Sequence, residues 1–154
     1  MREYTGNLWD FINPDAIVIT TNGDRNVTGR LIMGAGNAKE ARDRFPSLDE
    51  QLGKLVENGG NKVYCVSTKD LSGKPFTIVS LPTKHSYKDT QSDLMLIATG
   101  LANLVDMADQ KEWLEIIVPR PGVGNGKLSW DTQIRPLCES FLDDRFIVCD
   151  FVRE

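Results

Sequence analysis

The sequence predicts an α/β layered domain, because strand-like and helix-like segments alternate along its 154 residues without a repeat, a low-complexity tract or a long linker. The chain is 40% hydrophobic and 26% charged, which is typical of a globular domain. A domain of this size buries roughly 68–70% of its unfolded surface. We therefore expect one domain over residues 1–154, with a core that needs no disulfide or metal.

Five segments rich in β-branched and aromatic residues predict strands. They cover residues 16–20, 63–68, 76–81, 114–118 and 146–151. Residues 2–4 are expected to add an edge strand.

Helical patterns cover residues 38–44, 48–57, 93–109 and 131–142. Ser47 and Glu50 predict a capping box at the start of the second helix, and the Asn-Gly-Gly run at 58–60 predicts its end at residues that tolerate positive φ. Apolar residues at three- and four-residue spacing predict that the third helix buries one stripe on the sheet. Pro136 predicts that the last helix starts late or bends there.

Charge and cysteine usage narrow the class of protein. The net charge of −4 argues against a broad surface for nucleic acid or acidic membranes. Cys65, Cys138 and Cys149 lie in apolar stretches without a CxxC motif or a Cys/His cluster, so we expect buried, reduced thiols and no metal site. No stretch has the apolar length of a signal peptide or a membrane span, and a cytosolic (cytoplasmic) protein is expected.

Three loops that could carry chemistry each follow a predicted strand. They cover residues 21–36, 82–87 and 119–126. Ligands of open α/β sheets bind outside the carboxyl ends of the strands, so these loops are expected to share one crevice.

Two of these loops are rich in glycine. Residues 33–37 (MGAGN) lead into a helix, whose free N–H groups can bind an anion, and residues 122–126 (GVGNG) can form a second nest of N–H groups. Each loop alone could be an ordinary turn, whereas two nests facing one crevice suit a diphosphate. Neither the P-loop nor the G-x-G-x-x-G fingerprint fits, because Leu128 follows Lys127 and the glycines have the wrong spacing.

The order of these motifs resembles that of macrodomains over nearly the whole chain. The matching segments are residues 6–8 (GNL), 17–22 (IVITTN), 34–36 (GAG) with 41–46, 119–124 (PRPGVG) and 128–130 (LSW). Within that superfamily the chain is most similar to small bacterial and phage macro-like proteins, and to the group of the terminal ADP-ribose protein glycohydrolase and the ADP-ribose-1″-phosphate phosphatase. The resemblance implies a three-layer α/β/α fold with a mixed, mostly parallel sheet of about six strands, and ADP-ribose in the crevice.

The resemblance also implies a set of ligand-binding residues. Asn7 stands where the family has an acidic side chain for the adenine amino group, and an amide accepts that hydrogen bond more weakly. Asn22 matches an asparagine near the distal ribose, unless it is a turn residue, and Phe151 matches a cover for adenine, unless it belongs to the core. The full set is Asn7, Leu8, Asn22, Met33, Gly34, Ala35, Gly36, Asn37, Pro121, Gly122, Val123, Gly124, Asn125, Gly126 and Phe151.

Two residues are candidates for catalysis. Lys84 matches a lysine to which the glycohydrolase resemblance assigns attack on the distal ribose, but the acid that accompanies this lysine falls at Gly126. Asp131 lies nearby in sequence and is expected to cap a helix instead. His85, the single histidine, could transfer a proton or have a structural role. No residue matches the acid–base pair of the phosphatase.

The sequence therefore predicts a protein that binds ADP-ribose or an ADP-ribosylated protein or nucleic acid and hydrolyses an ADP-ribosyl linkage, without a cofactor. Three alternatives stay open: a noncatalytic ADP-ribose reader, an ADP-ribose-1″-phosphatase, and a nucleotide-binding domain unrelated to ADP-ribosylation.

Overall fold

A six-stranded sheet in the order β1-β6-β5-β2-β4-β3 forms the middle layer of the computed structural model, which describes residues 1–151. Neighbouring strands are parallel except β3 and β4, which form an antiparallel pair, so the expected mixed, mostly parallel sheet is confirmed. The strands are β1 (Arg2–Thr5), β2 (Ala16–Thr21), β3 (Tyr64–Lys69), β4 (Pro75–Pro82), β5 (Ile116–Pro119) and β6 (Phe146–Asp150).

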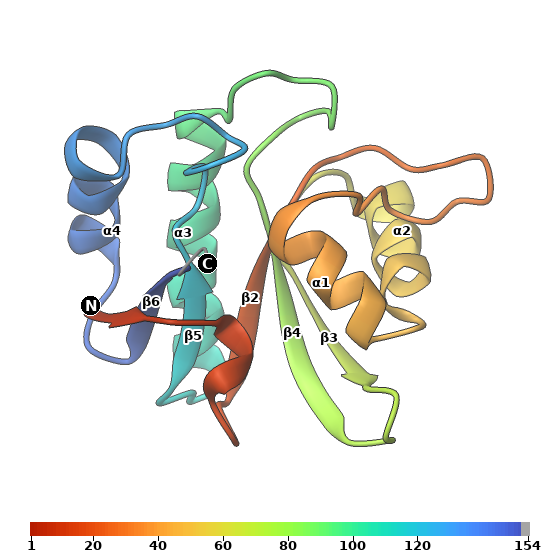
Figure 1. Ribbon diagram of the computed structural model, residues 1–154, viewed down its shortest axis with the longest axis horizontal. Helices are drawn as coiled ribbons and strands as arrows, with labels where there is room; N and C mark the ends of the chain where they lie inside the picture. Colours follow the sequence, from red (N-terminus) through yellow and green to blue (C-terminus); the bar gives the residue numbers. More distant parts are fainter. Residues whose placement is uncertain (152–154) are drawn as a thin grey trace.

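Helices cover both faces of the sheet (Figure 1). One face packs against α1 (Gly36–Arg44) and α2 (Leu48–Gly59), and the other against α3 (Leu94–Gln110) and α4 (Arg135–Phe141). The expected three-layer α/β/α fold is confirmed. None of these helices is both long and apolar enough to cross a membrane.

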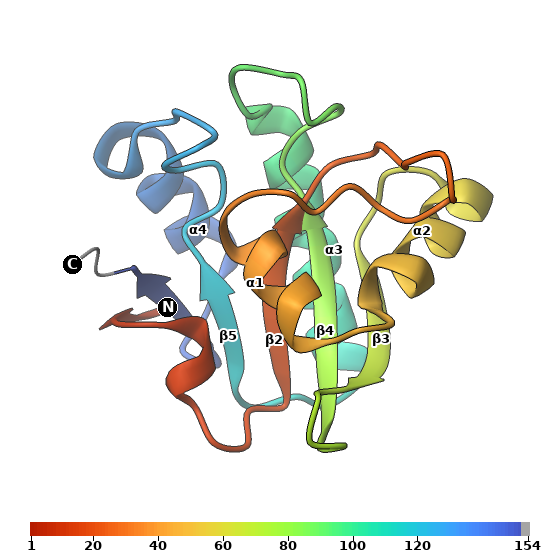
Figure 2. The same ribbon diagram turned by 45° about the vertical axis from the view of Figure 1, so that its right-hand side comes forward.

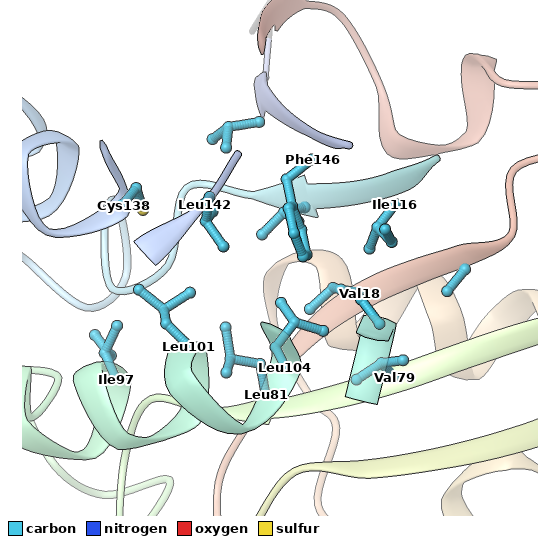
Figure 3. Packing of buried hydrophobic residues seen from close by; sticks show 14 of the residues in the cluster. Val18, Val79, Leu81, Ile97, Leu101, Leu104, Ile116, Cys138, Leu142 and Phe146 are labelled. Carbon is cyan, nitrogen blue, oxygen red and sulfur yellow. The ribbon is translucent and has the colours of Figure 1, made fainter. Parts of the chain in front are cut away.

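Alternation along the strands builds a separate core on each face. In β2, Val18 points to α3 and α4, whereas Ile17 and Ile19 point to α1 and α2. Figure 3 shows the first of these cores, where Leu101 and Leu104 of α3 lie against strand residues. The predicted apolar stripe of the third helix is therefore confirmed.

The start of α2 differs from the sequence prediction. Ser47 precedes the helix with nearly helical backbone angles and makes no capping hydrogen bond, so the predicted capping box is wrong. The carboxylate of Glu50 instead pairs with Arg30 and Lys54. The predicted end is confirmed at Gly60, whose φ is 87°.

The last helical segment has two parts. A π-helical turn, η2 (Trp130–Ile134), precedes α4, so Pro136 lies in the first turn of α4, where its missing N–H costs little. The side chain of Ser129 accepts a hydrogen bond from the Thr132 N–H and caps the turn. The expectation that Asp131 is the cap is therefore wrong.

The three cysteines are free thiols. Burial raises the pKa of Cys138 to about 12 and, together with a smaller effect of Asp10, the pKa of Cys149 to about 12. Within residues 1–151, the His, Cys, Asp and Glu side chains form no group of three that could hold a metal ion.

The sheet opens at the carboxyl ends of its central strands. β2 pairs with β4 as far as Thr21, but with β5 only at Ala16 and Ile17. The order in which strands join the sheet also reverses here. The strands that follow β2 in the chain, β3 and β4, lie on one side of this point, whereas β6, which follows β5, lies on the other side with β1. Such a switch point is where open α/β sheets bind ligands.

Candidate functional site

A cleft of about 850 Å³ lies over the carboxyl ends of β2, β4, β5 and β6. This volume falls in the range of small-molecule sites. Figures 1 and 2 show the loops that follow β2, β4 and β5 together at the top of the molecule. The expected shared crevice is therefore present.

The first glycine loop forms one wall of the cleft where it enters α1. Gly36 is the first residue of α1 and has a φ of 59°, and Ala35 before it has no side chain that could cap the helix. The N–H groups of a first helical turn have no partner inside the helix and can therefore bind an anion. Met33, Gly34 and Ala35 line the cleft.

Asn37 fastens this loop to the sheet. Its side-chain oxygen accepts a hydrogen bond of 2.7 Å from the backbone N–H of Thr20. Thr20 lies in the part of β2 that is no longer paired with β5. A second contact joins the Asn37 amide nitrogen to the Thr20 hydroxyl at 2.9 Å. Asn37 lines the cleft, but its amide holds α1 against β2.

The second glycine loop forms the opposite wall. Gly122 and Gly124 have φ values of 77° and 80°, which favour glycine, and the Leu128 N–H closes the loop on the Gly122 carbonyl at 2.9 Å. A Cβ atom added at Gly36 would lie 3.5 Å from the amide nitrogen of Asn125. The two glycine loops therefore approach each other across the cleft.

Gly126 has no room for a side chain. A Cβ atom there would collide with the Ser92 hydroxyl and with the Gly122 carbonyl. Ser92 is 6% exposed, and its hydroxyl has no hydrogen-bond partner within residues 1–151. The hydroxyl of Ser92 thus occupies the space that an acid at position 126 would need.

The β4 end of the cleft is polar. Lys84 extends its amine to the Asn125 carbonyl at 3.3 Å, and so bridges from the β4 loop to the second glycine loop. Thr21, Asn22 and Thr83 line the same end.

Asn22 shapes the loop that follows β2. Its amide nitrogen donates to the Ile32 carbonyl at 2.9 Å, and its oxygen accepts from the Asp24 N–H at 2.8 Å. Asn22 is therefore a turn residue that also lines the cleft.

Three expected site residues are not among those that line the cleft: Asn7, Pro121 and His85. His85 is 64% exposed, and its Nε2 lies 2.7 Å from the carboxylate of Asp93, which caps α3. This hydrogen bond lowers the pKa of Asp93. The backbone N–H of Asn7 donates to Asp10, while the neighbours Gly6 and Leu8 do reach the cleft.

The β6 end of the cleft is largely apolar. Leu8, Cys149 and Phe151 line it, and the 54% exposure of Phe151 excludes the alternative of a core residue. Beside them, the guanidinium of Arg120 lies 3.4 Å from the carboxylate of Asp150.

Arg120 is held by the carboxylate of Asp150 on one side and by the ring of Trp130 on the other. Its guanidinium carbon lies 4.2 Å from the centre of a Trp130 ring. Its Nε atom is buried and has no hydrogen-bond partner in the described part of the chain.

Sequence reasoning missed Arg120 and Asp150 as residues of the cleft. A charged residue directly at the end of a buried strand is the signal that could have found them.

The positive and negative charges of the side chains that line the cleft are equal in number. Lys84 and Arg120 are opposed by Glu40 and Asp150. An anionic ligand therefore depends on the backbone N–H groups of the two glycine loops.

The sequence is similar to two curated proteins, both named DNA ADP-ribosyl glycohydrolase, from Mycobacterium bovis and Mycobacterium tuberculosis. Each is 31% identical over 113 residues, which cover 71% of this chain and 32% of the relative. The match thus spans about a third of the length of these relatives. No family model matches the chain.

Solved macrodomains share the fold. The macrodomain of Mycobacterium tuberculosis DarG superposes with a TM-score of 0.75 at 26% identity, over 96% of this chain and 95% of that one. The macrodomain of Thermus aquaticus DarG gives a TM-score of 0.77 at 24% identity, over 99% and 97%. Thermosipho africanus DarTG in complex with ADP-ribose gives 0.72 at 18% identity, over 90% and 38%.

These similarities agree with the order of the sequence motifs, the mixed sheet between two helical layers, and a cleft bounded by two glycine loops. The chain belongs to the macrodomain superfamily.

Proposed function

We propose that this chain binds ADP-ribose in the cleft and hydrolyses the bond between the distal ribose and an attached group. The approach of the two glycine loops across the cleft is the observation that carries this proposal. Relatives that are 31% identical and named DNA ADP-ribosyl glycohydrolase support the same chemistry.

The diphosphate lies between the glycine loops in this proposal. The N–H groups at the start of α1 face it from one side, and the Gly122–Gly126 loop faces it from the other. This placement leaves the adenosine and the second ribose to occupy opposite ends of the cleft.

Adenine fits the β6 end. Phe151 and Leu8 offer apolar surface to a flat ring, and the carboxylate of Asp150 can accept hydrogen bonds from an amino group. Asp150 would thus supply the charge that Asn7 lacks.

The distal ribose fits the β4 end, where Thr21, Asn22 and Thr83 offer polar groups. Lys84 is the proposed nucleophile there. The lone pair of its amine attacks C1″ and the bond from C1″ to the attached group breaks. The departing group takes up the proton that the amine loses, and water then adds at C1″, which releases ADP-ribose and restores the lysine. A group at the cleft mouth can leave without disturbing the bound diphosphate.

Slow turnover is expected, because position 126 cannot hold an acid to assist departure of the attached group. The same observation keeps a noncatalytic reader as the second candidate. The free thiols fit a reducing compartment such as the cytoplasm.

A substrate panel tests the proposal. The wild-type chain is incubated with an ADP-ribosylated oligonucleotide, an ADP-ribosylated protein and ADP-ribose 1″-phosphate, and released ADP-ribose is measured. Release from a macromolecule supports the hydrolase, and release from the 1″-phosphate alone supports a phosphatase. Tight binding without release supports the reader, whereas no binding of ADP-ribose contradicts the proposal.

A further inference from the structure

Lys84, the proposed nucleophile, lies just beyond the end of β4. Its backbone carbonyl accepts a hydrogen bond of 3.0 Å from the side-chain amide of Asn61. Asn61 belongs to the segment between α2 and β3, which lies at the same end of the sheet (Figure 2). A side chain from a separate segment therefore holds the peptide bond that follows the nucleophile.

The two neighbouring carbonyls are held by backbone donors. The Thr83 carbonyl accepts a hydrogen bond of 2.8 Å from the Asp93 N–H. The His85 carbonyl accepts one of 3.2 Å from the Gly23 N–H. Of these three consecutive contacts, the middle one depends on the side chain of Asn61, so a single substitution removes it.

Asn61 is also packed in place. It is partly buried, and a Cβ atom added at Gly23 would lie 3.1 Å from its carboxamide carbon and 2.9 Å from the His85 carbonyl. The lack of a side chain at position 23 thus lets Asn61 lie against the loop that follows β2. An amide that is packed as well as hydrogen-bonded holds its partner in one orientation.

The orientation of the Lys84 backbone matters because the side chain is long. The amine lies 3.3 Å from the Asn125 carbonyl across the cleft, at the end of a flexible stem. Without the Asn61 hydrogen bond, the peptide after Lys84 is free to rotate, which moves its Cβ atom and the amine with it. A misplacement of about 1 Å can lower a reaction rate about 100-fold.

We infer that Asn61 is a positioning residue, which holds Lys84 in the orientation that its amine needs to attack C1″. The inference rests on the proposed function of the cleft. Asn61 itself is not among the residues that line the cleft. It therefore acts through Lys84 and not by touching the ligand.

The test compares steady-state hydrolysis by the wild type and by Asn61→Ala on the substrate that the wild type cleaves. Asn61→Ala should lower kcat roughly ten- to 100-fold, because the nucleophile is misplaced. KM and the affinity for free ADP-ribose should stay within about twofold of wild type, because the glycine loops are unchanged. Asn61→Leu keeps the shape of the side chain without its N–H donor, and should lose kcat to the same extent.

Gln51→Ala is the matched control. The side-chain amide of Gln51 donates to the Ser67 carbonyl at 3.1 Å and so joins α2 to β3 by the same kind of bond, and Gln51 is not among the residues that line the cleft. Gln51→Ala and Asn61→Ala should lower the unfolding midpoint by similar amounts, about 2–4 °C each. Gln51→Ala should keep the wild-type kcat, which separates positioning from a general loss of stability.

Reductive trapping supplies a readout that needs no macromolecular substrate. The open-chain aldehyde of free ADP-ribose, at C1″, condenses with the Lys84 amine and loses water. Cyanoborohydride then adds hydride to the carbon of the C=N bond, and water supplies a proton to the nitrogen. Mass spectrometry of the Lys84 peptide measures the rate, with the exposed Lys54 as reference. The rate at Lys84 should fall roughly tenfold in Asn61→Ala and stay unchanged in Gln51→Ala.

An unchanged kcat and trapping rate in Asn61→Ala would overturn the inference alone, and so would an equal loss in Gln51→Ala. A wild-type kcat in Asn61→Leu would do the same, since it would assign the effect to packing. If the wild type binds ADP-ribose without turnover, the trapping rates decide. A wild type that neither releases ADP-ribose nor is trapped at Lys84 overturns the proposed function and this inference together.

Discussion

Gly124 adopts a φ of 80° in the second glycine loop, where a β-branched side chain is strained and would project into space proposed for the diphosphate. Gly124→Val should therefore abolish ADP-ribose binding in calorimetry. Gly73→Val is the control, because Gly73 has a similar φ of 87° in the distant β3–β4 turn and open space around it. A folded Gly124→Val protein with wild-type affinity would show that the diphosphate lies elsewhere.

Lys84 carries the proposed nucleophilic step. Lys84→Ala should lose turnover on every cleavable substrate while keeping part of its affinity for ADP-ribose, because the glycine loops stay intact. Lys84→Arg keeps the positive charge but not the nucleophilic amine, and should be equally inactive. Release of ADP-ribose by Lys84→Ala at the wild-type rate would exclude a catalytic lysine and favour attack by a ligand-positioned water.

Asp150 is proposed to accept the adenine amino group. Asp150→Asn should weaken ADP-ribose binding by about tenfold, since a charge-assisted hydrogen bond is replaced by a neutral one. Ribose 5-phosphate, which has no base, should bind both proteins alike. An equal loss for both ligands would mean that Asp150 acts only by holding Arg120.

At the residue scale, the glycine loops could be predicted because their function depends on the backbone, which the local sequence largely determines. The role of Asn37 could not be predicted, and the sequence left Asn22 open between a ribose contact and a turn. Their amides are used within the protein, by Ile32 and by Thr20, and such contacts depend on how distant segments pack. Arg120 and Asp150 meet for the same reason, through adjacent strands that are far apart in the sequence.

At the scale of elements, α3 depends on its cap. The Asp93 carboxylate accepts hydrogen bonds from the Met95 and Leu96 N–H groups and from His85. Asp93→Ala should lower the free energy of unfolding by about 1 kcal/mol near neutral pH. Denaturant unfolding measures this change.

The loss should depend on pH. The hydrogen bond from His85, followed by the one from the Leu96 N–H, lowers the pKa of Asp93 in the folded state. A lowered pKa stabilises the fold above the pKa of the unfolded state, about 3.9, and the stabilisation disappears as the pH falls. The difference between wild type and Asp93→Ala should therefore shrink below about pH 4. A constant difference from pH 7 to pH 3 would contradict this account.

Element identities were easier to predict than element ends. All five main strands and the four helical segments appear, because hydrophobic periodicity sets them. The capping box predicted at Ser47 is absent, because the carboxylate of Glu50 pairs with Arg30 and Lys54 instead. The last helix begins late, because Pro136 is suited only to the first turn of a helix.

At the scale of the whole molecule, local patterns predicted an α/β domain but not the order of its strands. β1 and β6 come from opposite ends of the chain and pair along their length, which no local pattern reveals. The order of motifs, through the resemblance to macrodomains, supplied the mixed sheet. Because this pairing ties the first strand to the last, we propose that residues 1–154 fold as one domain.

The central claim is that one cleft binds both riboses of ADP-ribose, with the diphosphate between the two glycine loops. Isothermal titration of the wild-type chain with ADP-ribose and with AMP tests it most directly, because AMP lacks the second phosphate and the distal ribose. The account predicts that ADP-ribose binds at least about tenfold more tightly, a difference of about 1.4 kcal/mol. Equal affinity for the two ligands, or binding of neither, would contradict it.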